Sequence, residues 1–557
     1  MCLDFALVPA FAAQTWWQHD PATPGDWFDP ANWTAGVPGP ADYAYIDNAG
    51  TAKVQEGSAQ AEWLYLGYNA SDAGAVELSG GTLSSKCSHY LGYNGTGRFI
   101  QTGGTNAVEG KLYLGNSQAS LGTYDLSGDN VLVNLAKGTV LNAGQATLAV
   151  GANSLTIYAV GAHPSDLFGS FSTLGMMHQA GQTLVVALGQ GFGGRGDIDD
   201  HVVCAGSISA SGGGGMTLHD GVTVCVGGNV DLGSGKLIVE GSPSGVVAGA
   251  SLSADREYVG SAGGGRFTQA GGENTVGSYL SVAGGQGSSG VYELSAGDLS
   301  CPTESIGSEG TGTFIQSGGT NKAAESLHLG YGAGGSGTYQ LSGGQLQCPF
   351  QRVAYLGTGV FRHTGGTNTA SYGLVLADCG GAGTYELSGN AQLSAGFEWV
   401  GDWGTGLFVH TAGRNSVDSA LRLGGRDGSG TYELSGQAEL CSGEEHIGEE
   451  GAGVFRQTGG SNTVRGGLYL ARGFRSRGTY ELSGGRVWAG EEHIGGEGEA
   501  LFHQTGGTNV TSYLSIGRPG RYEFAGGALE ITGGLDVEGE LDCGGSAVTV
   551  NVGDNTL

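Results

Sequence analysis

Apolar and polar side chains alternate over short stretches of this chain, and glycines separate one stretch from the next. In GTYELSGG (residues 478–485), Tyr480 and Leu482 flank Glu481. A period of two is typical of a β-strand that turns one side to a core, and no segment shows the period of 3.6 that indicates a helix. We therefore predict an all-β protein with the tyrosine and leucine of each stretch inside. The glutamates of this stretch are predicted to point outward: Glu293, Glu386, Glu433, Glu481 and Glu523.

A related stretch with phenylalanine recurs at intervals of 47 residues. The phenylalanines are Phe267, Phe314, Phe361, Phe408, Phe455 and Phe502, and the asparagines seven positions later are Asn274, Asn321, Asn368, Asn415, Asn462 and Asn509. The tyrosine stretch lies between successive copies, at Tyr292, Tyr339, Tyr385, Tyr432, Tyr480 and Tyr522. This recurrence indicates a repeat architecture in which each unit is a pair of half-units of about 23–24 residues.

A half-unit of this length is predicted to be one coil of a single-stranded parallel β-solenoid, so that each 47-residue repeat forms two coils. The L-x-x-L-x-L-x-x-N framework of leucine-rich repeats is absent. Glycine supplies the backbone conformations that the corners of stacked coils require. We expect the phenylalanines, tyrosines and asparagines above to form structural ladders along the tube.

A line of polar residues is predicted inside the tube. The residues at the position of the leucine in the phenylalanine stretch are Gln101, Gln269, Gln316, His363, His410, Gln457 and Gln504. Because buried amides need hydrogen-bond partners, we interpret Gln316 and Asn321 as satisfying the backbone of the corner between them, while Leu341 and Leu346 fill the next coil. The alternative is an amide ladder on the surface that binds a ligand.

The chain divides into segments on its sequence pattern. The predicted segments are a signal-peptide remnant (1–13), a cap rich in Trp and Pro (14–60), first coils (61–135), a divergent β-helix block (136–250), regular 47-residue repeats (251–525) and C-terminal coils (526–557). FALVPAFA (residues 5–12) resembles the apolar part and cleavage site of a secretory signal, although no Lys or Arg precedes it. VGDNTL at the C-terminus resembles SGDNVLVNL at 127–135, so we expect a truncated gene product.

Charge and composition limit the classes of partner that the chain can bind. The 557 residues include 114 glycines, and 52 Asp and Glu face 23 Lys and Arg, for a formal net charge of −29. Nucleic acid and anionic membranes require a basic footprint, which disfavours both. No stretch is long and apolar enough for a membrane span. The predicted cap contains four tryptophans, Trp16, Trp17, Trp27 and Trp33. We expect them to cover the open end of the first coil, and the alternative is that they stack on carbohydrate.

We predict no catalytic, cofactor or metal site. The strongest acidic candidates are two copies of GEEHIG (443–448 and 490–495), with Glu304 and Glu398 in the same register. Members of that register lie two coils apart, roughly 9.6 Å, which is too far for one bidentate metal or an acid/base pair. We therefore interpret them as a solvated acidic stripe, with divalent-cation binding and catalysis as the alternatives. In GRGDIDDH (194–201), Arg195-Gly196-Asp197 is interpreted as a plain turn, with calcium binding by Asp197, Asp199, Asp200 and His201 as the alternative.

Cysteine positions make a separate prediction. Cys301, Cys348 and Cys441 share a register two or more coils apart, too far for disulfides. Cys204 and Cys225 lie 21 residues apart, close to one coil, so either a disulfide or a pair of free thiols fits.

The segment with Trp27, Asn32-Trp33, Gly36, Pro38, Asp42, Ala44, Ile46 and Asn48, followed by QTGGTN, LYLG and GTYELSGG stretches, resembles bacterial secreted β-helical surface proteins, such as autotransporter passengers and planctomycete-type surface proteins. The resemblance implies a right-handed β-helix at the cell surface with a structural or adhesive role. We expect a non-catalytic extracellular protein without cofactor whose partners are glycans, surface proteins or other copies of itself. The alternatives are a β-helical polysaccharide lyase or hydrolase and a subunit of an extracellular filament.

Overall fold

The chain folds into a parallel β-solenoid of about 22 turns with almost no helix, as the repeat pattern predicts. The computed structural model describes residues 12–108, 110–126, 130–135, 139–141, 147–210, 214–544 and 550–551. The first eleven residues of the predicted signal-peptide remnant and the VGDNTL segment after Asn551 therefore lie outside the described residues. The chain comprises two compact units, Met1–Lys236 and Leu237–Leu557, which are described separately.

The first unit stacks its strands in parallel from near its start. One sheet runs in the order β1 (Gln14–Trp16), β3 (Tyr43–Ile46), β5 (Ser58–Leu66), β7 (Thr82–Leu91), β10 (Leu112–Leu114) and β13 (Thr139–Leu141), with β9 (Thr105–Val108) beside β7. A second sheet runs β2 (Gly25–Asp26), β4 (Asn48–Val54), β6 (Ala73–Leu78), β8 (Thr96–Gln101), β11 (Leu121–Leu126), β14 (Thr147–Val150) and β16 (Ser170–Thr173). The first unit is therefore also built of stacked parallel coils, as the sequence pattern predicts.

The divergent block continues the stack with shorter strands. A third sheet contains β12 (Leu132–Leu135), β15 (Leu155–Tyr158) and β17 (Met176–Gln179). The following strands of this unit are β18 (Leu184–Val186), β19 (Gly191–Gly194), β20 (Gly196–Ile198), β21 (Val202–Cys204), β22 (Ser207–Ala210), β23 (Met216–Leu218), β24 (Val222–Val224) and β25 (Asn229–Asp231), and β26 (Lys236–Val239) follows them. Short helices occur at η1 (Pro30–Asn32) and α1 (Pro164–Leu167).

Three tryptophans lie in the core at the start of the first unit. Trp17, Trp27 and Trp33 are at most 2% exposed, and the Trp33 ring meets the other two edge-on at 5.0 and 4.9 Å. Trp33 Nε1 donates a hydrogen bond to the Trp27 carbonyl at 2.8 Å. These three rings are packing residues and offer no face to a carbohydrate.

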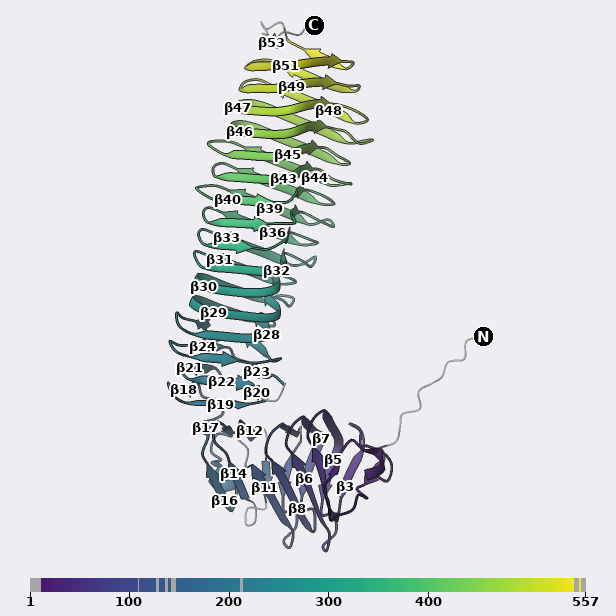
Figure 1. Ribbon diagram of the computed structural model, residues 1–557, viewed down its shortest axis with the longest axis vertical. Helices are drawn as coiled ribbons and strands as arrows, with labels where there is room; N and C mark the ends of the chain where they lie inside the picture. The colour runs from purple at the N-terminus through teal and green to yellow at the C-terminus, as the bar shows by residue number, and fades with distance from the viewer. Residues whose placement is uncertain are drawn as a thin grey trace, which may run out of the picture. The chain divides into compact units, whose positions relative to one another are not determined.

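In the second unit each coil consists of three strands, and Figure 1 shows the coils as successive rungs from β28 to β53. One coil contains β36 (Thr358–His363), β37 (Thr367–Ala370) and β38 (Gly373–Leu376), and they pair in parallel with β39 (Ala382–Leu387), β40 (Gln392–Ala395) and β41 (Glu398–Val400) of the next coil. In several coils two or three of these strands merge into one longer strand. The tube therefore has three sheet faces.

The remaining strands repeat this plan. Before β36 they are β27 (Ser244–Val246), β28 (Ser251–Val259), β29 (Gly264–Val282), β30 (Ser289–Ile306), β31 (Thr311–Gln316), β32 (Thr320–Leu329), β33 (Ser336–Leu341), β34 (Gln345–Gln347) and β35 (Phe350–Val353). After β41 they are β42 (Thr405–His410), β43 (Arg414–Leu423), β44 (Ser429–Leu434), β45 (Glu439–Ile447), β46 (Ala452–Leu470), β47 (Arg477–Ile494), β48 (Glu499–Gln504), β49 (Thr508–Ile516), β50 (Gly520–Phe524), β51 (Ala528–Val537), β52 (Glu540–Asp542) and β53 (Val550–Asn551).

The predicted phenylalanine and tyrosine ladders form one stack inside the second unit. From Phe267 to Tyr522 all twelve rings are 0% exposed, and successive ring centroids are 4.5–5.0 Å apart. This spacing equals the distance between paired strands, so each ring packs flat on the ring of the next coil. The inward assignment of these residues is confirmed.

Glycine is required where the corners of successive coils approach each other. Gly330 has φ = +61°, and a Cβ at this position would lie 2.2 Å from the carbonyl oxygen of Thr358 in the next coil. A side chain is thus excluded both by backbone conformation and by space.

Candidate functional site

A buried polar cluster recurs inside every 47-residue repeat of the second unit. The Tyr339 hydroxyl donates to Gln316 Oε1 at 2.6 Å, and Asn321 Nδ2 lies 3.1 Å from the same hydroxyl. Asn321 Nδ2 also donates to Glu304 Oε2 at 3.0 Å. All four side chains are 0% exposed. The cluster joins three successive coils, because Glu304, Asn321 and Tyr339 belong to one coil each.

The other repeats keep the cluster with limited substitutions. The six clusters, in the order Gln or His, Tyr, Asn, Glu or Gln, are Gln269–Tyr292–Asn274–Glu257, Gln316–Tyr339–Asn321–Glu304, His363–Tyr385–Asn368–Gln351, His410–Tyr432–Asn415–Glu398, Gln457–Tyr480–Asn462–Glu445 and Gln504–Tyr522–Asn509–Glu492. Burial lowers the pKa of His363 and of His410 to about 4, so both rings are neutral in the core.

The interpretation of the glutamine ladder is confirmed, and that of the asparagine ladder is wrong. Gln316 Nε2 donates to the carbonyl oxygens of Gly319 and Gln345, at 3.3 and 2.9 Å, which satisfies the corner as predicted. Asn321 instead bonds side chains of neighbouring coils. Sequence spacing placed it inside correctly, but its partners come from coils that the local sequence does not show.

The solvated acidic stripe is also wrong. Glu304, Glu398, Glu445 and Glu492 are all 0% exposed, whereas Glu444 and Glu491, their neighbours in the two GEEHIG stretches, are exposed. A period of two explains the division, since adjacent residues of a strand point to opposite sides. Glu257 belongs to the same line and was missed, although it precedes Glu304 by 47 residues.

The third repeat shows which protonation state the buried glutamates take. There, Gln351 stands in place of glutamate, and it forms a reciprocal amide pair with Asn368: Gln351 Nε2 donates to Asn368 Oδ1 at 2.6 Å and Asn368 Nδ2 donates back at 2.9 Å. In the second repeat, Glu304 Oε1 and Asn321 Oδ1 are both buried without a hydrogen-bond partner. A proton on Glu304 Oε1 completes the same pair.

Burial also favours the protonated form of these glutamates. It raises the pKa of Glu257, Glu304, Glu445 and Glu492 to about 7 and that of Glu398 to about 8, because an ionised carboxylate loses its hydration inside the tube. We therefore expect these carboxyls to be mostly protonated below about pH 7 and to ionise above it. Raised carboxyl pKa values often mark catalytic acids, but each of these side chains is sealed in the core, where substrate has no access.

The residues that directly follow the buried glutamate line point outward and form a chemically distinct column. On the second unit, the outer column runs over successive coils through His328, Arg352, Val375, Trp399, Arg422, His446, Tyr469 and His493, of which Val375 and His446 are only 4% exposed. The ring pairs His446–Tyr469 and Tyr469–His493 each stack at 5.0 Å. Aromatic and basic side chains are thus gathered on one line of a strongly acidic protein.

The first unit has an outward column of aromatic rings in the equivalent place. Tyr90 follows the buried His89 as Trp399 follows Glu398, and Tyr45, Tyr65, Tyr90 and Tyr113 stack at 4.9, 5.0 and 4.4 Å. Burial within this stack raises the pKa of Tyr45 to about 12. Neighbouring rings cover both faces of the inner members, so only ring edges and hydroxyls are available to a partner.

A hollow of about 220 Å³ opens beside the outer column of the second unit. It is lined by Trp399, Asp402, Arg422, Gly425, Arg426, Glu449 and Glu450. Arg422 Nε lies 2.8 Å from Glu449 Oε2, and Arg426 Nη1 lies 3.9 Å from Asp402 Oδ2. The guanidinium of Arg426 also lies 5.1 Å from the ring centre of Trp403. We call these residues together with Trp403 the tryptophan hollow.

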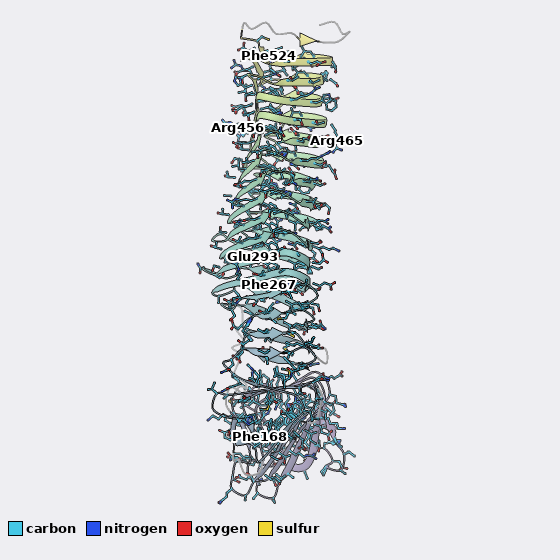
Figure 2. The ribbon with its side chains drawn as sticks, turned by 90° about the vertical axis from the view of Figure 1, so that its left-hand side faces the viewer. Phe168, Phe267, Glu293, Arg456, Arg465 and Phe524 are labelled. Atoms are coloured by element: carbon cyan, nitrogen blue, oxygen red, sulfur yellow. The ribbon has the colours of Figure 1, made fainter. Side chains whose placement is uncertain are left out.

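The predicted outward glutamates lie on another face and form ion pairs there. Figure 2 shows Arg456 and Arg465 at opposite edges of the second unit, and Arg456 Nε lies 3.0 Å from Glu481 Oε2. The equivalent Arg266–Glu293 pair is 2.5 Å apart. Because these groups are exposed, each pair contributes little to stability.

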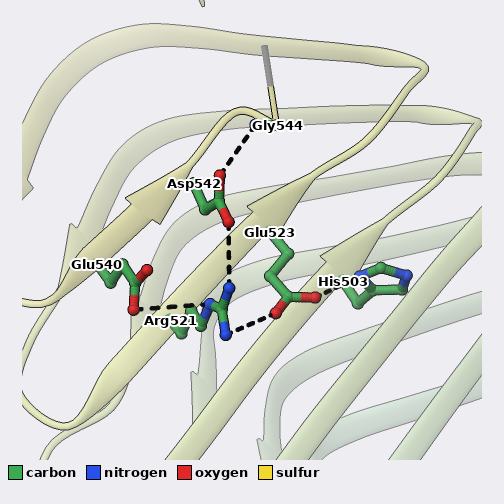
Figure 3. Close-up of polar contacts among 6 residues, drawn as sticks. All are labelled: His503, Arg521, Glu523, Glu540, Asp542 and Gly544. Carbon is green, nitrogen blue, oxygen red and sulfur yellow. Dashed lines mark hydrogen bonds and ion pairs between the residues drawn. The ribbon is translucent and has the colours of Figure 1, made fainter. Parts of the chain in front are cut away.

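The ion pairs end in a larger network on β50 and β52 (Figure 3). Arg521 lies 3.0 Å from Glu523, 3.1 Å from Asp542 and 3.6 Å from Glu540, and His503 lies 2.8 Å from Glu523. The contacts join His503 of β48 to the charged side chains of β50 and β52. We assign it to the structure of the last coils.

The GRGDIDDH stretch is not the plain turn that we expected. Asp197 lies in β20, where it pairs with Thr217, and its carboxylate lies 3.2 Å from His219 Nε2. Asp200 faces away to His178, at 2.9 Å. Within the described ranges, no group of three or more His, Cys, Asp or Glu side chains is placed to hold a metal ion.

Cys204 and Cys225 are free thiols, as are Cys301, Cys348 and Cys441. The disulfide alternative fails because Cys204 pairs with Val224, so Cys225 is one position out of register and turns to the other side of the strand.

Thiol labelling tests these positions. We expect Cys379, which is exposed, to react with iodoacetamide in the native protein, while Cys301 and Cys348, 1% exposed with pKa values raised by burial, stay unmodified until unfolding. Peptide mass mapping after a short exposure reads out all three sites. Equal labelling of Cys348 and Cys379 would contradict the buried register.

No helix of the described residues is long and apolar enough to cross a membrane. Comparisons of the chain with protein-family models, with curated proteins and with solved structures find no match.

Proposed function

We propose that this protein is a non-catalytic extracellular protein of the bacterial cell surface or matrix, with a structural or adhesive role. The observation that carries the proposal is the fate of the periodic acidic groups. The glutamates that recur along the solenoid, from Glu257 to Glu492, are enclosed and paired with asparagines, so they hold coils together and do not face solvent as an acid/base pair would. The repeated polar residues therefore stabilise the scaffold.

The outer column supports the adhesive part of the proposal. It places aromatic, histidine or arginine side chains on all but one of the coils from His328 to His493, and tryptophan, tyrosine and arginine are enriched at the centres of protein interfaces. Because coils are spaced by roughly 4.8 Å, the column presents contacts at regular intervals along a line. An extended partner with its own short repeat fits such a line better than a compact ligand does.

Two measurements test this proposal. Brief protease treatment of intact producing cells, followed by peptide mass spectrometry, is expected to release peptides of this chain but none from a cytosolic marker protein. Incubation of the purified chain with neutral and acidic polysaccharides is expected to produce neither new reducing ends nor unsaturated products. Shortened polysaccharide would favour the β-helical enzyme, and peptides found only after cell lysis would contradict the surface location.

A further inference from the structure

The tryptophan hollow contains side chains that the fold does not need. Trp403 is 45% exposed, and the residues 47 positions before and after it are Leu356 and Glu450. At the place of Trp399 the same two repeats have Arg352 and His446. Since different residue types serve equally well at these corners, packing does not explain the pair of tryptophans.

Arg426 connects the two tryptophans of the hollow through its side chain. Arg426 has φ = +37°, in the left-handed region that disfavours a side chain. The residue 47 positions earlier, Cys379, also has a left-handed φ, of +44°. The left-handed backbone therefore belongs to this corner in both repeats, and the arginine side chain is what distinguishes the hollow. The guanidinium of Arg426 lies 5.9 Å from the ring centre of Trp399 and 5.1 Å from that of Trp403.

Charge in the hollow indicates an uncharged ligand. Its two arginines face three carboxylates, Asp402, Glu449 and Glu450, so the lining carries no net positive charge, and the chain as a whole carries −29. A polyanion is therefore repelled. The paired guanidinium and carboxylate groups offer donors and acceptors side by side, which suits neighbouring hydroxyls.

We propose that the tryptophan hollow binds an uncharged oligosaccharide, whose apolar C–H face packs against Trp403 while its hydroxyls bond Arg422, Arg426 and the facing carboxylates. The ligand extends along the outer column toward the coils before and after the hollow. A volume of about 220 Å³ accommodates one sugar ring, and the open sides let the polymer continue. This inference rests on the proposed adhesive function and names its ligand class.

The experiment is isothermal titration calorimetry of the full chain with cellohexaose, laminarihexaose, xylohexaose, mannohexaose and chitohexaose, and in parallel with hexagalacturonate and hexalysine. We expect at least one uncharged hexasaccharide to bind, and Trp403→Ala to weaken that binding by about tenfold or more, the loss of a central contact. Trp488→Ala is the matched control, because Trp488 is also exposed (37%) but lies on another face, and it should leave the affinity unchanged.

A second variant distinguishes loss of binding from loss of folding. Glycine adopts the φ of +37° at this position more readily than arginine, so Arg426→Gly should keep or raise the melting temperature and still lose the binding. The inference is overturned when no uncharged hexasaccharide binds, when only hexagalacturonate or only hexalysine binds, or when Trp403→Ala binds as tightly as Trp488→Ala. Mass spectrometry of the ligand after titration separates the two proposals: a bound but shortened oligosaccharide supports the site and overturns the non-catalytic function.

Discussion

The second unit is expected to lose stability as the pH rises from about 4.5 to 8. Its five buried glutamates have an ordinary pKa of 4.5 and folded-state pKa values of about 7 to 8. The folded state thus retains protons that the unfolded chain has released, and stability that is complete below pH 4.5 is lost as the pH rises through 7. A pKa rise from 4.5 to about 7 corresponds to about 3 kcal/mol for each carboxyl. Thermal unfolding followed by circular dichroism across this range measures the change.

The matched variants separate this effect from repulsion within an acidic chain. Replacing all five glutamates with glutamine copies the natural pair Gln351–Asn368, so it should raise the melting temperature at pH 8 and flatten its pH dependence. Gln351→Glu should add a sixth titrating group and steepen it. Glu444→Gln, which changes the same charge on the exposed neighbour, should have little effect. A five-glutamine variant with an unchanged pH profile would contradict the protonated pairs.

The second large effect is expected from Phe314→Ala. Its ring is 0% exposed and stacks on Tyr292 at 4.8 Å and on Tyr339 at 4.7 Å, so the substitution opens a cavity on both sides. Removal of a buried phenylalanine costs about 3–5 kcal/mol. Because each coil contacts only its neighbours, the loss should appear as earlier unfolding around residues 290–340. Hydrogen exchange with mass spectrometry locates it.

The control for this variant is Phe474→Ala. Phe474 is 69% exposed at a corner, so its removal should change exchange protection very little. Uniformly faster exchange along the second unit in Phe314→Ala would show that the coils unfold as a single block, against the expectation for stacked repeats.

Much of this fold was predictable because its information is periodic. The 47-residue interval gave the coil length, and alternation gave the inward side for Phe314, Tyr339 and Gln316. Both follow from geometry that every coil shares. The same alternation, counted back from the inward Ile447, places Glu445 inside and Glu444 outside, whereas counting forward from Leu440 fails because the register shifts between Ser442 and Glu445. We read the acidic residues as solvated because charge usually is, although a protonated carboxyl paired with an amide is not a charge.

The partners of Asn321 were out of reach for a different reason. They come from the coil before and the coil after, at separations of 17 and 18 residues, and which side chains meet across three coils depends on the strand register. The tryptophan hollow was missed because its tryptophans and arginines are departures from the repeat. A search for periodicity averages such departures away, while a search for positions where one repeat differs from all others would have found Trp403 and Arg426.

The polar cluster imposes a rule on how such a gene changes length. Because each cluster takes its glutamate, its asparagine and its tyrosine from three consecutive coils, a phenylalanine coil must always alternate with a tyrosine coil. Deletion or duplication of 47 residues by recombination preserves every cluster, whereas loss of a single coil removes either the asparagine and glutamine of a cluster or the tyrosine of one cluster and the glutamate of the next, and leaves the remaining buried polar groups without partners. Descendants of this chain should therefore differ by even numbers of coils, and the repeat that is inherited is the pair.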